Sequence, residues 1–220
     1  MSWKNREVKF AQLEPEWFQA RMGCLTGSIV GDIMKGARGG YAKARETLLY
    51  KKAIEYMSGV DESEPIPQKF ADWGHDHEPD AIDCINVDKG VDLKSVGLIK
   101  SDFNNLVASS VDGITEDGSL VAEAKCPFYM HSHIKQIYHK PAIKLYSDAM
   151  YKKYYWQVRH HMLCTGAKTC AWISYNPNFE PKPAYIEYVD ADEKELGLLK
   201  DECMKFVTEL KLLCTEILNK

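Results

Sequence analysis

The chain has 220 residues, of which 45% are hydrophobic and 27% are charged, and its formal net charge is −4. These values are ordinary for a water-soluble globular protein and allow a single domain, residues 1–220, with a substantial core. They exclude a membrane-spanning chain, because no stretch approaches the roughly 18 consecutive apolar residues that a span requires. They also exclude a protein drawn to nucleic acid by its overall charge.

Seven cysteines are scattered along the chain without any Cys-x-x-Cys pair. An odd number at irregular spacing favours reduced thiols over a disulfide framework or a zinc site. The first residues also lack the apolar core of a signal peptide. We therefore predict a cytoplasmic protein.

The small net charge conceals two blocks of opposite sign. Residues 60–123 carry fifteen acidic and four basic side chains, whereas residues 124–179 carry eight basic and one acidic. A cation site collects carboxylates, and a polyanion site collects lysine and arginine, so local charge is more informative here than the total. The same blocks are also compatible with solvated helix faces.

The first 90 residues are predicted to be mainly helical. The predicted helices span residues 13–22, 29–34, 41–58 and 70–86. A basic, glycine-rich loop at 35–40 and an acidic, proline-bearing connector at 61–67 separate them. Gly59 is expected to end the third helix, and Pro79 either breaks the fourth helix or lies in its first turn.

Strands dominate from residue 91 onward. The predicted strands span residues 91–93, 97–100, 106–110, 120–125, 168–174 and 184–189. Three more helices are predicted over residues 131–139, 145–164 and 192–219. This order of helices, antiparallel meander, helix, two strands and helix predicts an α/β (α+β) fold with a central mixed β-sheet flanked by helices.

The segment 109–125 has the pattern of a hairpin whose two strands are joined by a tight turn containing Asp-Gly. Strand side chains alternate between faces, so Glu123 and Lys125 must point the same way. Asp112 on the preceding strand can lie opposite them. The sequence therefore places two acids and a lysine together.

Two carboxylates of this kind can bind a hard cation such as Mg²⁺, which would stabilise the charge that develops when a phosphodiester is hydrolysed. A neighbouring lysine can orient the attacking water, and the Ala124 carbonyl is a further oxygen ligand. A salt-bridged edge hairpin without any catalytic role explains the same residues equally well.

A third acid, Glu78, follows Gly74 by one helical turn. The small glycine would let this helix approach the sheet, so that Glu78 either supports a metal site or remains a surface acid. The neighbouring His75 and His77 would point in two directions from a helix, which indicates a solvated face rather than a transition-metal site.

A possible phosphate pocket lies near the N-terminus, where Arg21 follows Trp17 by one helical turn and precedes Thr26 and Ser28. A fixed guanidinium with hydroxyl groups and backbone N–H groups at a helix start can bind phosphate. From these residues alone, an arginine stacked on tryptophan for packing is the favoured interpretation.

The predicted helix 145–164 carries Lys153, Gln157 and His161 at a spacing of four residues, which places them on one face. If this face is buried beside a cation site, Gln157 can bind a water or a phosphate. A polar stripe on a solvated helix face is the more common case.

Five short blocks occur in order over roughly residues 15–175. They are Trp17-x-x-x-Arg21-x-Gly23-x-x-Thr26-Gly27-Ser28, Trp73-Gly74-x-x-x-Glu78, Ser110-Val111-Asp112-Gly113, Glu123-Ala124-Lys125-Cys126-Pro127-Phe128 and Gln157-Val158. Together they resemble the YqaJ-like viral recombinases, the phage lambda-type alkaline exonuclease family within the PD-(D/E)xK nuclease superfamily. Val111 stands where the superfamily usually has proline, at a position that packs rather than reacts.

The resemblance implies a restriction-endonuclease-like core and 5′→3′ degradation of one strand of linear double-stranded DNA, leaving a 3′ single-stranded tail. The implied catalytic residues are Asp112, Glu123, Lys125, Glu78 and Gln157. Asp112 and Glu123, with the Ala124 carbonyl, would bind two Mg²⁺ ions, for which Mn²⁺ could substitute. Lys125 would lie beside the attacking water.

The resemblance also implies how DNA and partners are bound. The implied pocket for the 5′-phosphate consists of Arg21, Ser28 and Ser110. The candidate DNA contacts are Trp17, Thr26, Lys35, Arg38 and Lys153. Family members form ring-shaped homotrimers around duplex DNA and act with a single-strand annealing protein, so a phage or prophage protein in the bacterial cytoplasm is expected.

Two alternatives remain at this stage. One is a structure-specific or restriction-type endonuclease of the same fold, which would not need a pocket for a terminal phosphate. The other is a non-catalytic module that binds DNA ends, which would not need an intact set of Asp112, Glu123 and Lys125.

Overall fold

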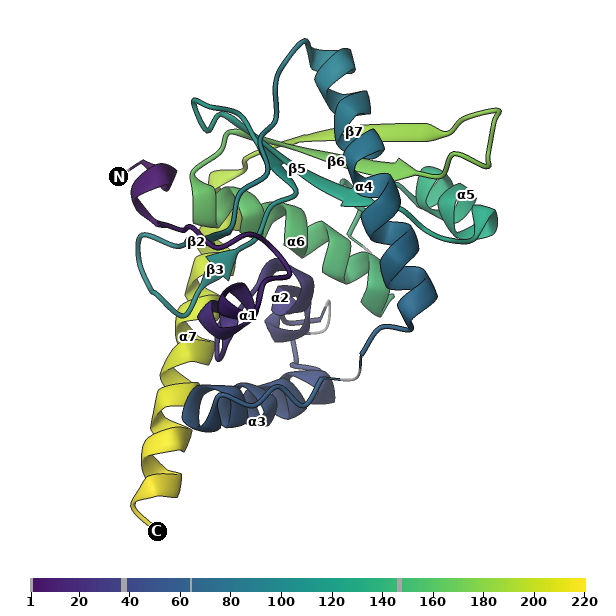
Figure 1. The fold of residues 1–220 in the computed structure, drawn as a ribbon. Helices are drawn as coiled ribbons and strands as arrows, with labels where there is room; N and C mark the ends of the chain where they lie inside the picture. The colour runs from purple at the N-terminus through teal and green to yellow at the C-terminus, as the bar shows by residue number, and fades with distance from the viewer. Residues whose placement is uncertain (1, 37–38, 64, 146–147) are drawn as a thin grey trace.

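The computed structural model describes residues 2–36, 39–63, 65–145 and 148–220. Its helices are η1 (Trp3–Asn5), α1 (Pro15–Arg21), α2 (Gly27–Ile33), α3 (Lys43–Ser58), α4 (Gln68–Lys89), α5 (Met130–His139), α6 (Ala149–Thr165) and α7 (Glu193–Leu218). Its strands are β1 (Glu7–Val8), β2 (Leu98–Lys100), β3 (Ala108–Ser109), β4 (Gly113–Ile114), β5 (Leu120–Lys125), β6 (Thr169–Tyr175) and β7 (Ala184–Asp190). Figure 1 shows the helices arranged around the strands, which confirms the predicted α/β fold class.

The larger sheet has four strands in the order β4-β5-β6-β7 and is mixed, as the sequence predicts. Its centre is the parallel pair β5 and β6, in which Glu123 lies beside Trp172. A parallel pair needs a long crossover, and here α5 and α6 provide it. The antiparallel strands β4 and β7 complete the two edges.

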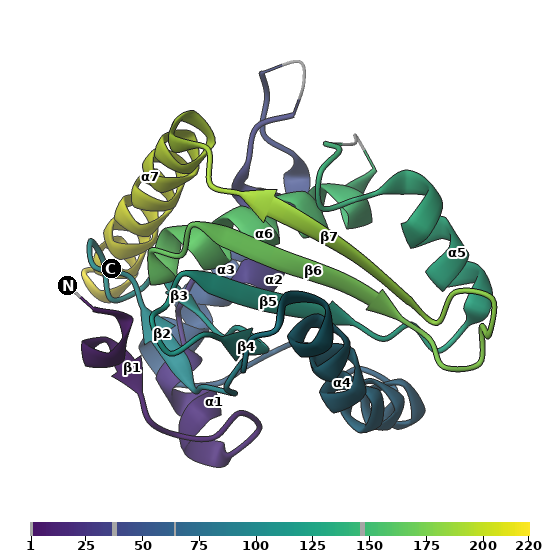
Figure 2. The same cartoon turned by 90° about the horizontal axis from the view of Figure 1, so that it is seen from above.

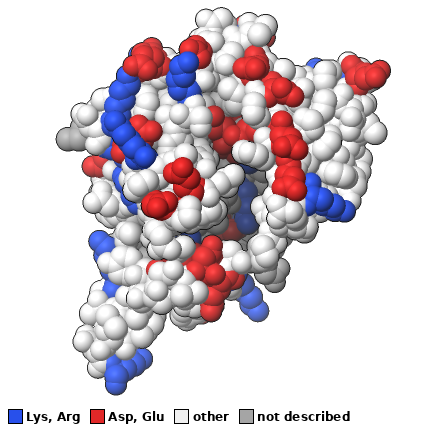
Figure 3. All heavy atoms as spheres, in the orientation of Figure 1, with Lys and Arg blue, Asp and Glu red and all other residues white. Residues whose placement is uncertain are grey.

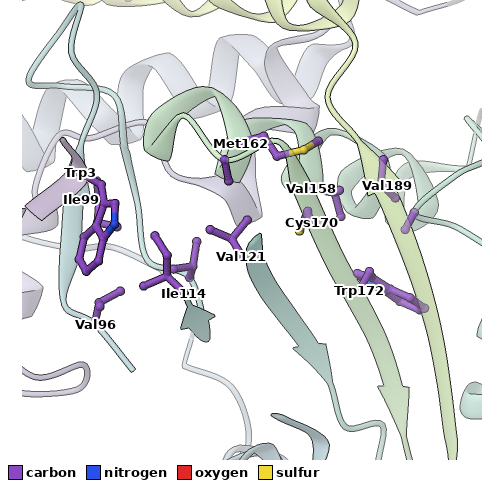
Figure 4. Close-up of a cluster of buried hydrophobic side chains, with 13 residues drawn as sticks. Trp3, Val96, Ile99, Ile114, Val121, Val158, Met162, Cys170, Trp172 and Val189 are labelled. Atoms are coloured by element: carbon purple, nitrogen blue, oxygen red, sulfur yellow. The ribbon is translucent and has the colours of Figure 1, made fainter. Parts of the chain in front are cut away.

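Helices α6 and α4 cover opposite faces of this sheet (Figure 2). On one face Val121 and Trp172 pack with Val158 and Met162 of α6, and Figure 4 shows this cluster between the helix and the strands. On the other face, alternate residues of β5 and β6 pack against α4, with Ile85 fully buried. The alternation predicted for β5 therefore decides which side chains face α6.

Helix α2 lies against α6 because glycines on its inner side allow a very close approach. A Cβ atom at Gly31 would lie 2.8 Å from Cα of Lys153, and one at Gly27 would lie 3.0 Å from Cε1 of His161. Both distances leave little or no room for a side chain. These glycines therefore bring the N-terminal segment next to the helix that covers the sheet.

The predicted meander is wrong in one respect. The strand expected over 106–110 and the first strand of the hairpin form two short pieces, β3 and β4, which belong to different sheets. The chain passes between the sheets at Ser110–Asp112, where the Asp112 N–H donates to Ala122 O over 3.1 Å. The separate sheet is antiparallel, with the order β1-β2-β3.

Two further expectations differ from the structure. Residues 91–93 form no strand, because only the following Lys94 pairs, in an isolated bridge with Ile114. Pro79 neither breaks its helix nor lies in the first turn, since α4 continues through it. Gly59 does end α3, in the left-handed conformation at φ 69°. Among the described helices, none is long and apolar enough to cross a membrane.

Candidate active site

The charged centre predicted from the hairpin lies at the carboxyl-terminal end of β5. Glu123 and Lys125 both point to the α6 face, and the Lys125 ammonium is in contact with Oε1 of Glu123. Asp112 reaches the same strand from the crossover, where its Oδ2 accepts the Ala124 N–H over 2.7 Å. The structure therefore brings together the two acids and the lysine that the sequence placed on adjacent strands.

Glu123 is held from both sides although it is only 3% exposed. Besides Lys125, its Oε1 accepts a hydrogen bond from Nε2 of Gln157 over 2.6 Å. Its Oε2 lies 2.6 Å from Nε2 of His161. Both partners belong to α6, so this face of the helix is buried and not solvated.

These contacts decide the charge states of the pair. Burial alone would raise the pKa of Glu123, but Lys125 and His161 outweigh it and lower that pKa to about 2. Burial alone would lower the pKa of Lys125, but the Glu123 carboxylate raises it above its ordinary value. At neutral pH the pair is therefore ionised, and Lys125 acts as a cation and hydrogen-bond donor, not as a base.

The other two acids behave in the opposite way. Burial, followed by the charges of Glu123 and Glu78, raises the pKa of Asp112 well above its usual range. Burial and the charge of Glu123 also raise the pKa of Glu78, which approaches the cluster from α4. Three carboxyl groups thus share a space in which their ionised forms repel one another.

This arrangement is chemically suited to a hard divalent cation, which would offset the mutual repulsion of the acids. The oxygens of Glu123 already accept hydrogen bonds, Oε1 from Lys125 and Gln157 and Oε2 from His161. Within the described ranges, no group of three His, Cys, Asp or Glu residues is placed closely enough to hold a metal. Because each carboxylate oxygen has two lone pairs, Oε2 can still bind a cation while it accepts from His161. The assignment of Asp112, Glu123 and the Ala124 carbonyl as ligands stays a prediction.

A second feature is a cavity of about 230 Å³ near the N-terminal helices. Trp17, Arg21, Thr26 and Ser28 all line it, so the structure unites four of the residues singled out in the sequence. The Arg21 guanidinium lies over the Trp17 ring, with 3.9 Å between its Cζ atom and the ring centroid. The stacking interpretation and the pocket interpretation are therefore compatible.

Arg21 shares this cavity with two carboxylates, Glu55 and Asp61, but contacts neither in an ion pair. Within the part of the chain that the structure describes, its guanidinium makes no hydrogen bond and no ion pair. Burial lowers the pKa of Arg21, and the smaller opposing influences come from Cys24, Glu55 and Asp61. Glu55 itself is bound to Lys52 over 2.6 Å and to the N–H of Gly23 over 3.0 Å. A half-buried, unpaired guanidinium is chemically suited to an anionic ligand.

The remaining predicted contacts are distributed differently. Ser110 is not among the residues lining the cavity, and its Oγ is buried with no partner among the described residues. Lys153 is 3.0 Å from Asp32, in an ion pair. Lys35 lies over the Tyr41 ring at 5.4 Å. Arg38 lies outside the described residues.

Of the two interpretations of the charge blocks, the structure favours solvated faces for much of the acidic one. Much of the acidic block is a solvated face, since acidic side chains run along the surface of α4 in Figure 3. Two members of the basic block, Lys153 and Arg159, serve in ion pairs with Asp32 and Glu195. The site therefore depends on a few buried charges and not on the blocks as a whole.

Sequence reasoning missed two residues. One is His161, whose spacing of four residues from Gln157 is the signal that it also faces Glu123. Lys52 also lines the cavity. It lies in α3, which is distant in sequence from the Trp17–Ser28 segment, so no local pattern could connect them.

The fold and the site define an α/β protein with a buried acid–lysine centre and a separate cavity that contains Arg21. The model of the YqaJ-like viral recombinase domain matches residues 16–168, so the chain belongs to this family. The comparison with curated protein sequences gives no match.

Solved structures support the same fold. An alkaline exonuclease, LHK-Exo from Laribacter hongkongensis, is 24% identical, with a TM-score of 0.79 and coverage of 94% of this chain and 97% of that chain. LHK-Exo in complex with dAMP gives 25% identity, a TM-score of 0.79 and coverage of 93% and 96%. A phage-related exonuclease from Haemophilus somnus 129PT is 15% identical, with a TM-score of 0.68 and coverage of 88% and 96%.

Proposed function

We propose that this protein is a Mg²⁺-dependent 5′→3′ exonuclease that degrades one strand of linear double-stranded DNA and leaves a 3′ single-stranded overhang. The observation that carries the proposal is the combination of two features in one α/β fold. One is the centre of Asp112, Glu123 and Lys125. The other is the cavity that contains the unpaired Arg21.

The chemistry follows from the residues at the end of β5. Mg²⁺ bound there by Asp112, Glu123 and the Ala124 carbonyl would stabilise the charge on the phosphorane and lower the pKa of a bound water. Lys125, which remains a cation, can donate a hydrogen bond to the attacking water or to the scissile phosphate. Glu78 and Gln157 would support the acids from α4 and α6.

The polarity of the reaction follows from the cavity. A 5′-terminal phosphate is an anion that can accept hydrogen bonds from Arg21 and Ser28. Hydrolysis between the first two nucleotides places the water oxygen on phosphorus and releases the 3′ oxygen of the terminal nucleotide. The shortened strand then begins with a new 5′-phosphate, which is again a ligand for the cavity. Ser110, whose buried Oγ is unpartnered, is a third candidate ligand.

The similar proteins are consistent with this proposal. LHK-Exo was crystallised with dAMP, and a deoxynucleoside monophosphate is the product expected from a DNA exonuclease. We further propose a ring-shaped homotrimer around the duplex, a single-strand annealing protein as partner and action in the cytoplasm of a bacterial host. Sedimentation of the purified protein would test the trimer.

The central proposal is tested with linear duplexes that carry a single label at either the 5′ or the 3′ end of one strand. Each duplex is incubated with and without Mg²⁺, and the released label is followed over time. We expect early release of the 5′ label as a mononucleotide, only with Mg²⁺. Asp112→Ala serves as the control for a contaminating nuclease and should release no label while still binding the duplex.

Three results would contradict the proposal. Release of the 3′ label first would reverse the polarity. Cleavage of covalently closed circles would indicate an endonuclease. Equal digestion by the wild type and Asp112→Ala would remove the metal-binding role from the acid cluster.

A further inference from the structure

His161 lies at the junction of three segments and has no role in the proposed reaction so far. It belongs to α6 and is 1% exposed. Its Nε2 is 2.6 Å from Oε2 of Glu123 on β5, and its Nδ1 is 2.5 Å from Oγ of Ser109 on β3. Both ring nitrogens are therefore engaged, one with a candidate metal ligand and one with a hydroxyl.

The direction of these hydrogen bonds follows from the chemistry of the groups. An ionised carboxylate only accepts, so the hydrogen between His161 and Glu123 must be on Nε2. In the neutral imidazole Nδ1 then accepts from the Ser109 hydroxyl, and in the imidazolium it donates to that oxygen. In either form His161 donates to Oε2 of Glu123, and Ser109 fixes the orientation of the ring.

The ring is also confined sterically. Gly27 of α2 lies directly behind it, where a Cβ atom would be 3.0 Å from Cε1 of His161 and 3.1 Å from Cγ of Gln157. The backbone of α2 therefore closes the space into which either side chain could rotate. The same segment carries Thr26 and Ser28 of the cavity, so the two sites are separated by one layer of backbone.

We propose that His161 is a positioning residue, which fixes one oxygen of Glu123 so that the carboxylate keeps the orientation needed to bind a divalent cation together with Asp112. This inference rests on the proposed metal-dependent function. Gln157 and Lys125 engage the other oxygen, Oε1, so His161 alone among the described residues contacts Oε2. Hydrogen-bond partners of metal ligands typically contribute about 10- to 100-fold to metal affinity or activity.

The test measures the affinity of the protein for Mg²⁺ by calorimetry in the absence of DNA. His161→Leu removes the donor, and we expect it to weaken Mg²⁺ binding by about 10- to 100-fold. His161→Gln keeps an N–H near the position of Nε2 and should restore the affinity to within about 3-fold of the wild type. In digestion assays His161→Leu should recover part of its kcat at high Mg²⁺ concentration, with an unchanged KM for DNA ends.

His160 provides a matched control, because it is the neighbouring residue on α6, is fully buried and contacts Cys164 instead of the acids. His160→Leu should bind Mg²⁺ as the wild type does. Ser109→Ala provides a second measurement should His161→Leu fail to fold, since it leaves the imidazole in place. We expect it to weaken Mg²⁺ binding by about 3-fold.

The possible failures are distinguishable. If the wild type binds no divalent cation, the proposed metal-dependent function is wrong. If the wild type binds Mg²⁺ and His161→Leu binds it equally well, only the positioning role is wrong. The role is equally wrong if His161→Gln is as weak as His161→Leu, because the ring would then merely fill space.

Discussion

The acid–lysine centre and the arginine cavity both contain buried charge, but they differ in how that charge is paired. Glu123 has a donor on each oxygen, supplied by β5 and α6. Arg21 stacks on the face of Trp17 and makes no ion pair among the described residues, although Glu55 and Asp61 line the same cavity. In the first region the charge is held by direct contacts, whereas in the second the guanidinium has no direct ion-pair partner among the described residues.

This difference indicates two separate tasks. A reaction centre gains from groups that are already oriented, because reorganisation during the reaction raises the barrier. A recognition pocket gains from an unpaired charge, because an ion pair within the protein would compete with the ligand. Mutations should therefore separate turnover in the first region from end selection in the second.

Lys125→Ala, in the acid–lysine centre, should give the largest effect on turnover. It removes the cation beside Glu123, so we expect turnover to fall by at least about 100-fold while DNA ends still bind. Single-turnover digestion measures this loss. Lys135→Ala, which removes an exposed lysine of α5, is the matched control and should digest normally. Turnover at the wild-type rate would reduce Lys125 to a structural role.

Arg21→Ala tests the role of the arginine cavity in selecting DNA ends. The variant should lose about 10- to 100-fold in preference for 5′-phosphorylated over 5′-hydroxyl ends, because a charged hydrogen bond to the phosphate is removed. Competition between the two kinds of duplex measures this preference, and turnover of DNA already bound should change little. Lys153→Ala removes a lysine that already has Asp32 as partner and should keep the preference. An unchanged preference in Arg21→Ala would place the pocket elsewhere.

Gly27→Ala tests the boundary between the two regions. The added methyl group would press on His161 and Gln157, so the free energy of unfolding should fall by about 1–3 kcal/mol. Mg²⁺ affinity should fall as well. Gly197→Ala on α7 is the matched control, because a Cβ there meets no atom within 4 Å and alanine favours a helix. Equal stabilisation of both variants would show that α2 can move away without cost.

The pH dependence of stability gives the smallest effect. Burial lowers the pKa of His160 to about 3, whereas the unfolded value is about 6.5. Between these values only the unfolded chain takes up the proton, so this residue makes stability fall with decreasing pH by up to about 1.4 kcal/mol per pH unit. Above pH 6.5 His160 is neutral in both states, so it does not change the dependence of the free energy of unfolding on pH.

Urea unfolding of His160→Gln from pH 6.5 to 4.5 measures this slope. In the variant the free energy of unfolding should fall less steeply with decreasing pH, by the contribution of about one bound proton. His131→Gln, on an exposed part of α5, should retain the wild-type slope. Parallel slopes in the wild type and His160→Gln would show that His160 takes up a proton in the folded protein.

Local periodicity predicted much of the centre. Alternation along 120–125 placed Glu123 and Lys125 on one face, and the structure confirms their contact. The four-residue spacing also placed Gln157 and His161 on one face of α6, and both contact Glu123. Such patterns are readable because they depend only on strand and helix geometry.

Other features depend on segments that are far apart in the chain. The strand predicted over 106–110 is shortened because the chain crosses from one sheet to the other at Ser110–Asp112. The burial of His161 depends on the close approach of α2 at Gly27, and Lys52 enters the cavity from α3. Sequence periodicity does not predict which distant helices and strands pack against one another.

The sequence by itself determined the helices, the principal strand β5, the shared face of Glu123 and Lys125, and the family resemblance. Only the tertiary structure decided that Glu123 is held from both sides and that Arg21 has no ion-pair partner in the described chain. The physical reason is that periodicity fixes the direction of a side chain relative to its own element. The charge state and pairing of that side chain depend on what other elements bring against it.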